Sequence, residues 1–301
     1  MVPDTLKFMS DTRNTGDAWV TAADGQRYWG RFGAAGLLAH DPSKGILLQH
    51  RVNWSDHGGT WGIPGGARHE SESAIDGAKR ESLEEAGVPV RATAAMFTHV
   101  LDLGGWRYTT VIAEVTRPFE PEITDAESHE LSWVALNQVS AYPLHPGFAQ
   151  SWRFLQSLVG PRPAIIVDSA NVIGSVPNGW WKDRRGAQER LRDRVASVVA
   201  PGIPAGMLGL TQSDYPGIDR VFPLWTLVSE GVARGVPSVP GVNLADAPLL
   251  GDDTIVAETH RLIAEGRRVT VVTADEELRE RVSAAGAILR SPQILLRHLP
   301  E

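Results

Sequence analysis

Three glutamates in the first third of the chain have the spacing of a metal-binding helix face. Glu81, Glu84 and Glu85 lie at positions i, i+3 and i+4 of the segment GGARHESESAIDGAKRESLEEAG, so they share one face of a predicted helix at about 72–86. Like charges this close repel one another, and a divalent cation would offset the repulsion. Carboxylate oxygens suit Mg²⁺ or Mn²⁺, which often bind substrate phosphates as well.

The residues around these glutamates follow a fixed pattern. Five residues separate Gly66 from Glu72, seven more lead to Arg80 and Glu81, and Glu84–Glu85 are followed by Gly87–Val88. Gly66 lies in a tight loop where its carbonyl can approach a metal, and Gly87 suits a left-handed helix cap. This spacing resembles the signature of the Nudix hydrolases. A solvated acidic helix is the alternative, but it would not explain the agreement at nearly every specified position.

The resemblance covers roughly residues 18–155 and implies an α/β/α sandwich around a mixed sheet. It also implies metal-dependent attack of water on a diphosphate linked to a nucleoside or similar group. Arg80 would orient a glutamate, and Glu72 would hold Arg80. Ser82 departs from the family pattern, which has an aliphatic residue there, and we expect an effect on packing only. The implied metal ligands are Gly66, Glu81, Glu84 and Glu85.

The loop HRVNWSDHGGTWGIPGG at 50–66 precedes this pattern, as in MutT-like members, and favours a nucleoside triphosphate as substrate. Aromatic side chains here and at 106–108 either stack on a base or pack in the core. Glu127 is placed where some family members carry a further metal ligand or base; a solvated loop acid is the alternative. The candidate substrate-binding residues are Arg51, Trp54, Trp61 and Tyr108, with Trp106 as a further aromatic candidate.

The elements that position these residues follow from hydrophobic patterning. Alternating segments predict strands at 28–41, 45–52, 94–103, 106–116 and 131–136, and a helix at 145–159. GPRPA at 160–164 is a linker candidate. Beyond it, buried strands at 164–168, 221–231 and 267–275 alternate with helices at 185–199, 253–266 and 276–286, which predicts an α/β domain with a parallel sheet. Residues 201–219 are rich in Gly and Pro and receive no assignment.

Acidic residues in the second half follow the predicted strands. Asp168 ends AIIVD, Glu230 follows LWTLVS, and Asp275 follows RVTVVTA, while Asp252 and Asp253 start a helix. Ligands of parallel α/β sheets bind beyond the carboxyl ends of strands, and several carboxylates there can hold one or two divalent metals. Helix capping is the alternative for the aspartates at 252, 253 and 275.

Residues 163–297 resemble the PIN-like nucleases, and within them the NYN group. The resemblance implies metal-dependent cleavage of RNA or flap-like DNA, with Asn171 and Asp252 near the metals. Arg184, Arg185, Arg190, Arg192 and Arg194 either contact phosphates or form a solvated face with the interleaved acids. The implied metal ligands are Asp168, Glu230, Asp253 and Asp275.

Composition sets the limits of these readings. The chain has 301 residues, 42% of them hydrophobic, enough for about two domains. It has no cysteine, which excludes disulfides and thiolate metal sites, and its net charge of −7 argues against a strongly basic nucleic-acid surface. We expect a cytoplasmic protein without membrane spans, with a tail at 1–17, a Nudix domain at 18–159 and a PIN-like domain at 163–301.

The function predicted from the sequence is hydrolysis of a nucleoside-linked diphosphate, combined with a metal-dependent ribonuclease domain. The predicted partners are a nucleotide substrate and RNA, and the oligomeric state stays open. A nucleotide-sensing or RNA-binding regulator, whose Nudix domain binds ligand without turnover, is the competing function.

Overall fold

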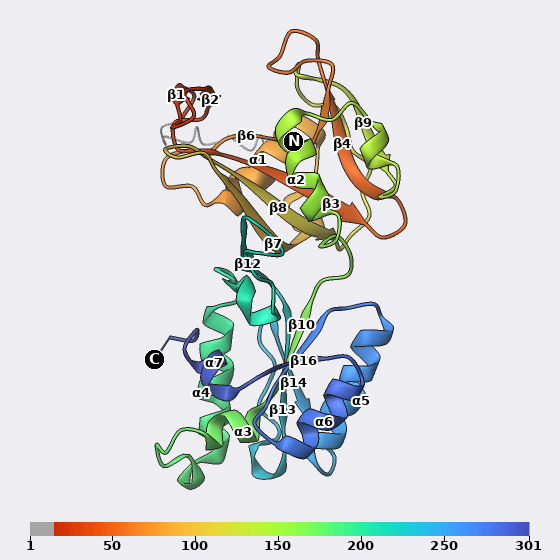
Figure 1. The fold of residues 1–301 in the computed structure, drawn as a ribbon. Helices are drawn as coiled ribbons and strands as arrows, with labels where there is room; N and C mark the ends of the chain where they lie inside the picture. Colours follow the sequence, from red (N-terminus) through yellow and green to blue (C-terminus); the bar gives the residue numbers. More distant parts are fainter. Residues whose placement is uncertain (1–14, 301) are drawn as a thin grey trace, which may run out of the picture.

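The computed structural model describes residues 15–300, which form two layered α/β units stacked end to end (Figure 1). The expected tail at 1–17 falls almost entirely outside these residues. Each unit is built on its own sheet, and a short hairpin of β1 (Trp19–Thr21) and β2 (Arg27–Trp29) lies beside the first. No helix within 15–300 has both the length and the apolar character needed to cross a bilayer.

The first unit contains a mixed sheet. Strands β3 and β8 pair in parallel, and the other pairings in this sheet are antiparallel. The predicted hairpin at 94–116 is confirmed, because β7 and β8 pair over their full lengths. The strands contributed by the N-terminal half are β3 (Ala34–Asp41), β4 (Gly45–Arg51), β5 (Trp61–Gly62), β6 (Gly65–Ala67), β7 (Thr93–Asp102), β8 (Arg107–Val115) and β9 (Ser128–Val134).

Two helices cover opposite faces of this sheet. On one face α1 (Ala74–Ala86) packs against β3, because Ala78 and Ala86 allow a close approach. On the other, α2 (Pro146–Leu155) inserts Phe148 and Trp152 into a second cluster. All eight residues of β3 are buried between the helices, which confirms the expected α/β/α sandwich.

One predicted strand is interrupted. The segment 28–41 was expected to be continuous, but it divides into β2 and β3 at Gly30–Gly33. Gly30 and Gly33 have φ values of 109° and 83°, in the region that favours glycine, so the chain turns here instead of extending.

The second unit is a five-stranded parallel sheet in the order β14-β13-β10-β15-β16. Its strands are β10 (Ala164–Asp168), β13 (Leu224–Ser229), β14 (Val242–Asp246), β15 (Val269–Val272) and β16 (Ile288–Arg290). Helices α5 (Gly251–Ala264) and α6 (Glu276–Ala284) lie on one face; α3 (Ser169–Gly174), α4 (Arg184–Ser197) and α7 (Pro292–Leu296) lie on the other (Figure 1). The expected parallel α/β unit is confirmed, although the sequence reading did not find α3, β14, β16 or α7.

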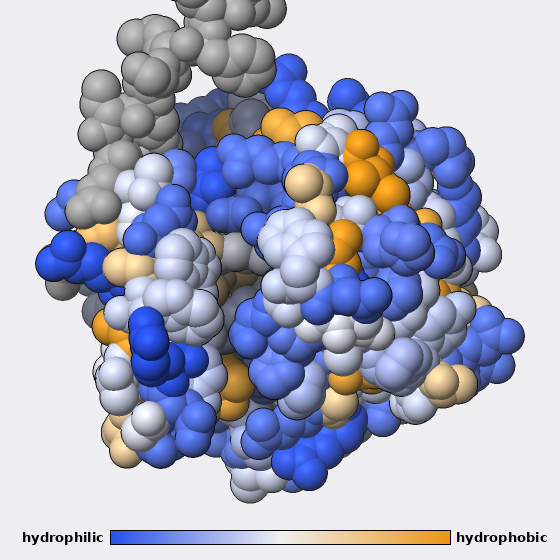
Figure 2. Space-filling model, turned by 90° about the horizontal axis from the view of Figure 1, so that it is seen from above, coloured by the Kyte–Doolittle hydropathy of each residue, from blue (hydrophilic) through white to orange (hydrophobic). Residues whose placement is uncertain are grey.

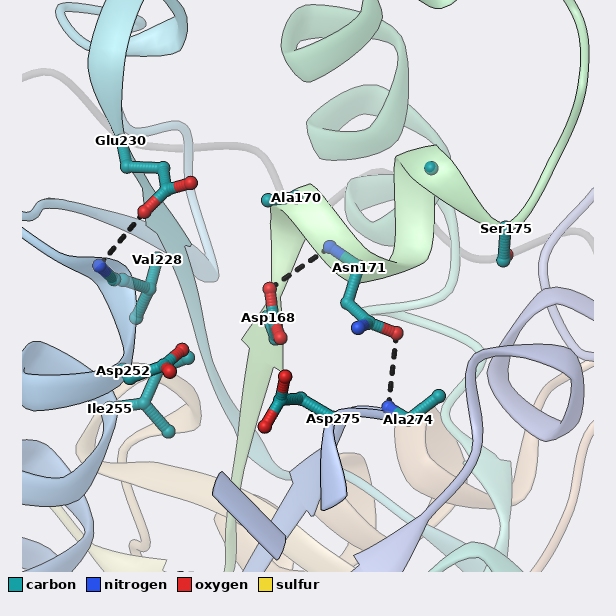
Figure 3. Close-up of a pocket in the computed structure, with 12 residues that line it drawn as sticks. Asp168, Ala170, Asn171, Ser175, Val228, Glu230, Asp252, Ile255, Ala274 and Asp275 are labelled. Carbon is teal, nitrogen blue, oxygen red and sulfur yellow. Dashed lines mark hydrogen bonds between the residues drawn. The ribbon is translucent and has the colours of Figure 1, made fainter. Parts of the chain in front are cut away.

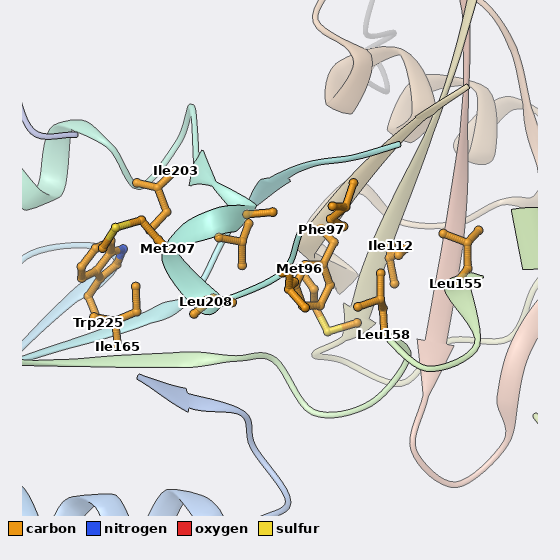
Figure 4. Packing of buried hydrophobic residues seen from close by; sticks show 14 of the residues in the cluster. Met96, Phe97, Ile112, Leu155, Leu158, Ile165, Ile203, Met207, Leu208 and Trp225 are labelled. Atoms are coloured by element: carbon orange, nitrogen blue, oxygen red, sulfur yellow. The ribbon is translucent and has the colours of Figure 1, made fainter. Parts of the chain in front are cut away.

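The Gly- and Pro-rich residues that received no assignment connect the two sheets. They contain β11 (Ile203–Pro204) and the start of β12 (Ile218–Val221), and β12 pairs antiparallel with β7 at the edge of the first sheet. Phe97 of β7 and Leu208 belong to one hydrophobic cluster that also reaches Ile165 of β10 (Figure 4). The second half of the chain therefore completes the sheet of the first half and shares its core.

The end of the molecule formed by the first unit is polar. Seen from above, this face is mostly hydrophilic, with small separated hydrophobic spots (Figure 2). Patches of this size are ordinary for a globular protein surface.

Candidate metal sites

Arg80 organises the glutamates of α1. Its Nε and Nη2 each donate to a carboxylate oxygen of buried Glu72 at 3.0 Å. Its Nη1 donates to Glu81 at 2.8 Å and to Glu84 at 3.0 Å. Such charge-assisted bonds are the strongest kind for arginine, and they fix the direction of both carboxylates. The predicted chain from Glu72 through Arg80 to a glutamate is present in this geometry.

Glu85 lies deeper than its neighbours. Its side chain accepts a hydrogen bond from the Gly65 amide at 2.8 Å, and the residue is only 7% exposed. Burial raises the pKa of Glu85 to about 8, and the nearby charge of Glu81 acts in the same direction. Burial also raises the pKa of Glu81. A cation bound beside these two acids would favour their charged, carboxylate forms.

Gly66 closes the other side of this group. A Cβ atom at Gly66 would lie 2.6 Å from a carboxylate oxygen of Glu81, so only glycine fits against that oxygen without displacing it. Carboxylates, a backbone carbonyl and water are the usual ligands of Mg²⁺. The residues present therefore fit a hard divalent ion held by Glu81, Glu84, Glu85 and the carbonyl of Gly66.

The ends of α1 fix this arrangement in place. The Ser73 side chain caps the N-terminus by accepting from the Asp76 amide, and Gly87 ends the helix with φ 62°. Ser82 is fully buried, and its hydroxyl donates to the Ala78 carbonyl at 2.6 Å. It lies on the packed face of the helix, away from the carboxylates, where the sequence reading had placed it.

A cavity of about 160 Å³ opens beside Gly65. Arg51 and Tyr108, two of the candidate substrate residues, line it together with Trp106. Trp106 is buried, stacks on Tyr28 with ring centroids 4.5 Å apart, and donates through Nε1 to the Gly30 carbonyl at 3.1 Å. This wall combines aromatic surface with a guanidinium group.

Two candidate substrate residues lie elsewhere. Trp61 is 7% exposed and stacks on His50 at 4.7 Å within the core, so it does not line the cavity. Trp54 is 70% exposed in the loop after β4 and is not part of the cavity lining either. Indole rings serve packing as readily as binding, so the sequence could not separate them from Tyr108.

The loop before β9 lies against the end of α1. Thr124 donates from its hydroxyl to the Glu84 carbonyl at 2.6 Å, and the charge of Asp125 contributes to the raised pKa of Glu85. Glu127 is half exposed, with its carboxylate 3.9 Å from a guanidinium nitrogen of Arg51. Asp125, two residues before Glu127, is not among the residues predicted from the sequence, because loop residues carry no periodicity that shows their direction.

A second acidic pocket, of about 530 Å³, lies at the carboxyl ends of the parallel strands (Figure 3). Asp168 ends β10; its carboxylate accepts from the Asn171 amide at 3.0 Å and from the Thr273 hydroxyl at 2.8 Å. Asn171 in turn accepts from the Ala274 amide at 3.0 Å. These contacts tie the strand ends of β10 and β15 together, at the edge where ligands of such sheets bind.

Glu230 and Asp275 also line this pocket. Glu230 follows β13 and accepts from the Gly251 amide at 2.9 Å, and Asp275 caps α6 by accepting from Leu278 at 2.8 Å. Burial raises the pKa of Asp168, with further contributions from the charges of Asp252 and Glu230. Asp275 therefore serves as a helix cap and also lines the acidic pocket.

Asp252 and Asp253 lie the other way round from the arrangement predicted from the sequence. Asp252 lines the pocket, and burial raises its pKa, with the charge of Asp275 adding to the effect. Asp253 points away and pairs with Arg281 at 2.7 Å on the surface. One residue along a helix changes direction by about 100°, so Asp252, and not Asp253, lies toward the pocket.

The arginines of α4 are mostly engaged with protein groups. Arg185 donates to the Gly235 carbonyl at 2.9 Å and lies 3.4 Å from Glu189. Arg184 lies over the Trp180 ring at 5.5 Å, and both line a smaller groove that shares Glu230 with the acidic pocket. Arg190, Arg192 and Arg194 bind Asp183, Asp193 and the Pro300 carbonyl, respectively. Of this run, only Arg184 adjoins the acidic pocket.

Comparisons with known proteins concern mainly the first half of the chain. Residues 30–158 match the model of the NUDIX domain. A Mycobacterium tuberculosis protein named "Putative 8-oxo-dGTP diphosphatase 3" is 44% identical over 171 residues, covering 54% of this chain and 78% of the relative. A "Nucleoside triphosphate pyrophosphatase/Nudix hydrolase fusion protein" of Bifidobacterium longum is 40% identical, covering 49% of this chain and 32% of that protein.

Among solved structures, the chain is similar to RenU, a Nudix hydrolase from M. Smegmatis. The identity is 45%, the match covers 48% of this chain and 94% of that chain, and the TM-score is 0.43.

Proposed function

The chain belongs to the Nudix family, and from that premise we propose that its N-terminal unit hydrolyses a nucleoside triphosphate to the monophosphate and pyrophosphate. The chain is a hydrolase that acts on phosphoric anhydride bonds. The observation that carries the proposal is the Arg80 network, which directs Glu81 and Glu84 beside buried Glu85 at the edge of an aromatic cavity.

The residues divide into four tasks in this proposal. Glu81, Glu84, Glu85 and the carbonyl of Gly66 hold Mg²⁺ or Mn²⁺, which when bound neutralises phosphate charge and acidifies water. Arg80 positions the carboxylates and is itself held by Glu72. Glu127 serves as a further ligand or base, and Arg51, 3.9 Å from it, contacts the substrate.

The proposed substrate is a purine nucleoside triphosphate, and an oxidised one in particular. The relatives named "Putative 8-oxo-dGTP diphosphatase 3" support this choice. The cavity beside Gly65 independently supports a substrate that carries a base, because Tyr108 and Trp106 offer aromatic surface next to the glutamates.

A panel of 8-oxo-dGTP, dGTP, ATP, NAD and ADP-ribose with Mg²⁺ tests this proposal, with products separated by chromatography. We expect monophosphate and pyrophosphate from 8-oxo-dGTP, at a higher kcat/KM than from dGTP. Tight nucleotide binding without any product would instead support a nucleotide-sensing regulator. Hydrolysis of ADP-ribose or NAD alone would replace the triphosphate as substrate.

For the C-terminal unit we propose a PIN-like, metal-dependent ribonuclease. The supporting observation is the convergence of Asp168, Glu230, Asp252 and Asp275 on one pocket at the strand ends. Such a group of carboxylates suits one or two divalent ions that act on phosphodiesters. Trp180 and Arg184, in the adjoining groove, offer a ring and a charge to a single RNA strand.

Cleavage of a fluorescent single-stranded RNA with Mn²⁺ tests the second activity. Glu84→Gln combined with Glu85→Gln provides the background, so that nucleotide hydrolysis does not interfere. Asp168→Asn should abolish cleavage, whereas Asp253→Asn, whose carboxylate faces Arg281, should leave it unchanged. RNA binding without cleavage in the background protein would reduce this unit to an RNA-binding domain.

A further inference from the structure

A different set of metal-ligating side chains lies away from the glutamates of α1. Asp56 and His57 belong to the loop between β4 and β5, and His145 directly precedes α2. One ligand atom from each residue can be chosen so that all three lie within 4.8 Å of one another. The two imidazole rings are 4.7 Å apart and nearly perpendicular, at 82°.

Hydrogen bonds within the loop hold Asp56 and His57 in place. The amide of Arg51 donates to the Thr60 carbonyl at 2.9 Å, and the Gly59 amide donates back to Arg51 at 3.0 Å. The Thr60 hydroxyl donates to the His57 carbonyl at 2.6 Å. The two ligand residues are therefore adjacent on a closed turn, which lowers the conformational entropy lost on binding an ion.

The third residue is fixed by the start of a helix. The amide of His145 donates to the Trp61 carbonyl at 2.7 Å, and its Nδ1 accepts from the Gly147 amide at 3.2 Å. Ligation through Nε2 places the proton on Nδ1, which can then no longer accept from the Gly147 amide. That hydrogen bond is already long for its kind. The position of the ring is retained through the backbone.

One positive charge lies close to this set. The Nε of Arg51 donates to the Asp56 carbonyl at 3.1 Å, which directs the guanidinium toward the backbone of the loop. Its Nη2 lies 3.9 Å from the carboxylate of Glu127, which partly offsets the charge. The carboxylate of Asp56 adds a negative charge on the side of the histidines.

We propose that Asp56, His57 and His145 bind one divalent transition-metal ion, with Zn²⁺ as the expected species, at a site separate from the Mg²⁺ ligands. Two imidazoles and one carboxylate form a donor set that suits Zn²⁺ and its neighbours, whereas Mg²⁺ prefers oxygen ligands only. The site joins the β4–β5 loop to the start of α2. It goes beyond the proposed hydrolase and does not depend on it.

A bound ion would also affect the cavity beside Gly65. Arg51, His145 and Gly147 all line the cavity beside Gly65. An ion held by His145 and the loop would therefore add a direct link between two parts of the cavity wall, which backbone hydrogen bonds of Trp61 with Pro143 and His145 already join. We expect bound Zn²⁺ to restrict opening of this wall.

A zinc titration of untagged, full-length protein against a chromophoric chelator tests the site, with saturating Mg²⁺ present to occupy the glutamates. His57→Ala and Asp56→Asn should each weaken Zn²⁺ binding about tenfold or more. His145→Asn should do the same while keeping a side chain that caps α2. His260→Ala removes an exposed histidine of α5 and serves as the matched control. Equal zinc affinity in all four variants and the wild type would overturn the proposal.

Hydrogen exchange provides a readout that is independent of activity. Adding Zn²⁺ to the wild type should slow amide exchange in residues 52–60 and at the start of α2, and should have no such effect in His57→Ala. Protection confined to α1, or protection that is the same in both proteins, would contradict the site.

Discussion

The two acidic sites of the molecule are organised by different means. In the first unit, Arg80 contacts three glutamates, and its own position is fixed by buried Glu72. In the second, no lysine or arginine of the described residues lines the pocket, and backbone amides and hydroxyls hold Asp168 and Glu230. The first site therefore carries an internal counter-charge, and the second has none in its lining.

This difference determines how much compensating charge each site needs from a bound cation. At the first site, a cation adds to an ionic network that already directs the carboxylates. At the second, burial and mutual repulsion raise the pKa of Asp168 and of Asp252, so an ion would supply the main compensating charge. Similar clusters of acids can thus differ in how far they are formed before metal binds.

The largest difference in stability between the two sites is expected when Arg80 is replaced. Arg80→Ala leaves Glu72 buried without its partner, which costs about 3–5 kcal/mol in the free energy of unfolding. Arg281→Ala removes the surface partner of Asp253 beside the second site and should leave the free energy of unfolding nearly unchanged, because solvent screens an exposed ion pair. Urea denaturation of both variants measures the difference, and equal losses would refute the role of Arg80 as the internal counter-charge.

The pH dependence of stability tests the burial of Glu85 at the first site. The folded-state pKa of Glu85 is about 8, above its ordinary value, so the folded protein retains a proton that the unfolded chain releases. Without metal, stability should therefore fall as pH rises from about 5 to 8, by at most about 1.4 kcal/mol per pH unit.

Denaturation of metal-free protein across this pH range measures that slope. Glu85→Gln should make the slope shallower, because the amide does not titrate, while Glu81, Asp168 and Asp252, whose pKa values burial also raises, still contribute. Saturating Mg²⁺ should also make it shallower, because the ion favours the carboxylate. An unchanged slope in Glu85→Gln would assign the titration to groups other than Glu85.

The two adjacent aspartates of α5 offer a narrower test at the second site. Asp252→Asn should weaken Mn²⁺ binding to this pocket about tenfold, whereas Asp253→Asn should leave it unchanged. Mn²⁺ is titrated into protein whose Glu84 and Glu85 are changed to Gln, and free Mn²⁺ is measured by electron paramagnetic resonance. The background changes isolate binding at this pocket. Equal affinities in the two variants would restore Asp253 as a candidate ligand.

The smallest effect is expected on the packed face of α1. Ser82→Ala removes a buried hydroxyl that bonds only within its own helix, so stability should change by at most about 1 kcal/mol. Hydrolysis rates should stay at the wild-type value because the carboxylates lie on another face. Loss of activity in this variant would mean that the departure from the family pattern affects the chemistry.

Local spacing accounts for what the sequence predicted well. Glu81, Glu84 and Glu85 lie within two turns of one helix, so their shared face follows from helical periodicity alone. The strands ending at Asp168 and preceding Glu230 were found because buried parallel strands read as continuous apolar runs.

Long-range pairing accounts for what the sequence did not show. Residues 218–221 join β7 across more than a hundred residues, and no local pattern marks a partner at that distance. His57 and His145 meet for the same reason, through the fold and not through a motif. Which of Asp252 and Asp253 lines the pocket could not be predicted for a different reason, since it depends on where α5 begins to within one residue.

The most direct test of the central claim is Mg²⁺-dependent nucleotide hydrolysis by the Glu84→Gln, Glu85→Gln double variant, with its fold checked by circular dichroism and thermal unfolding. Metal ligation supplies several kcal/mol to such reactions, so we predict a loss in kcat of about 10³-fold or more in a folded protein. Wild-type activity in a folded double variant would contradict the assignment of these glutamates as metal ligands.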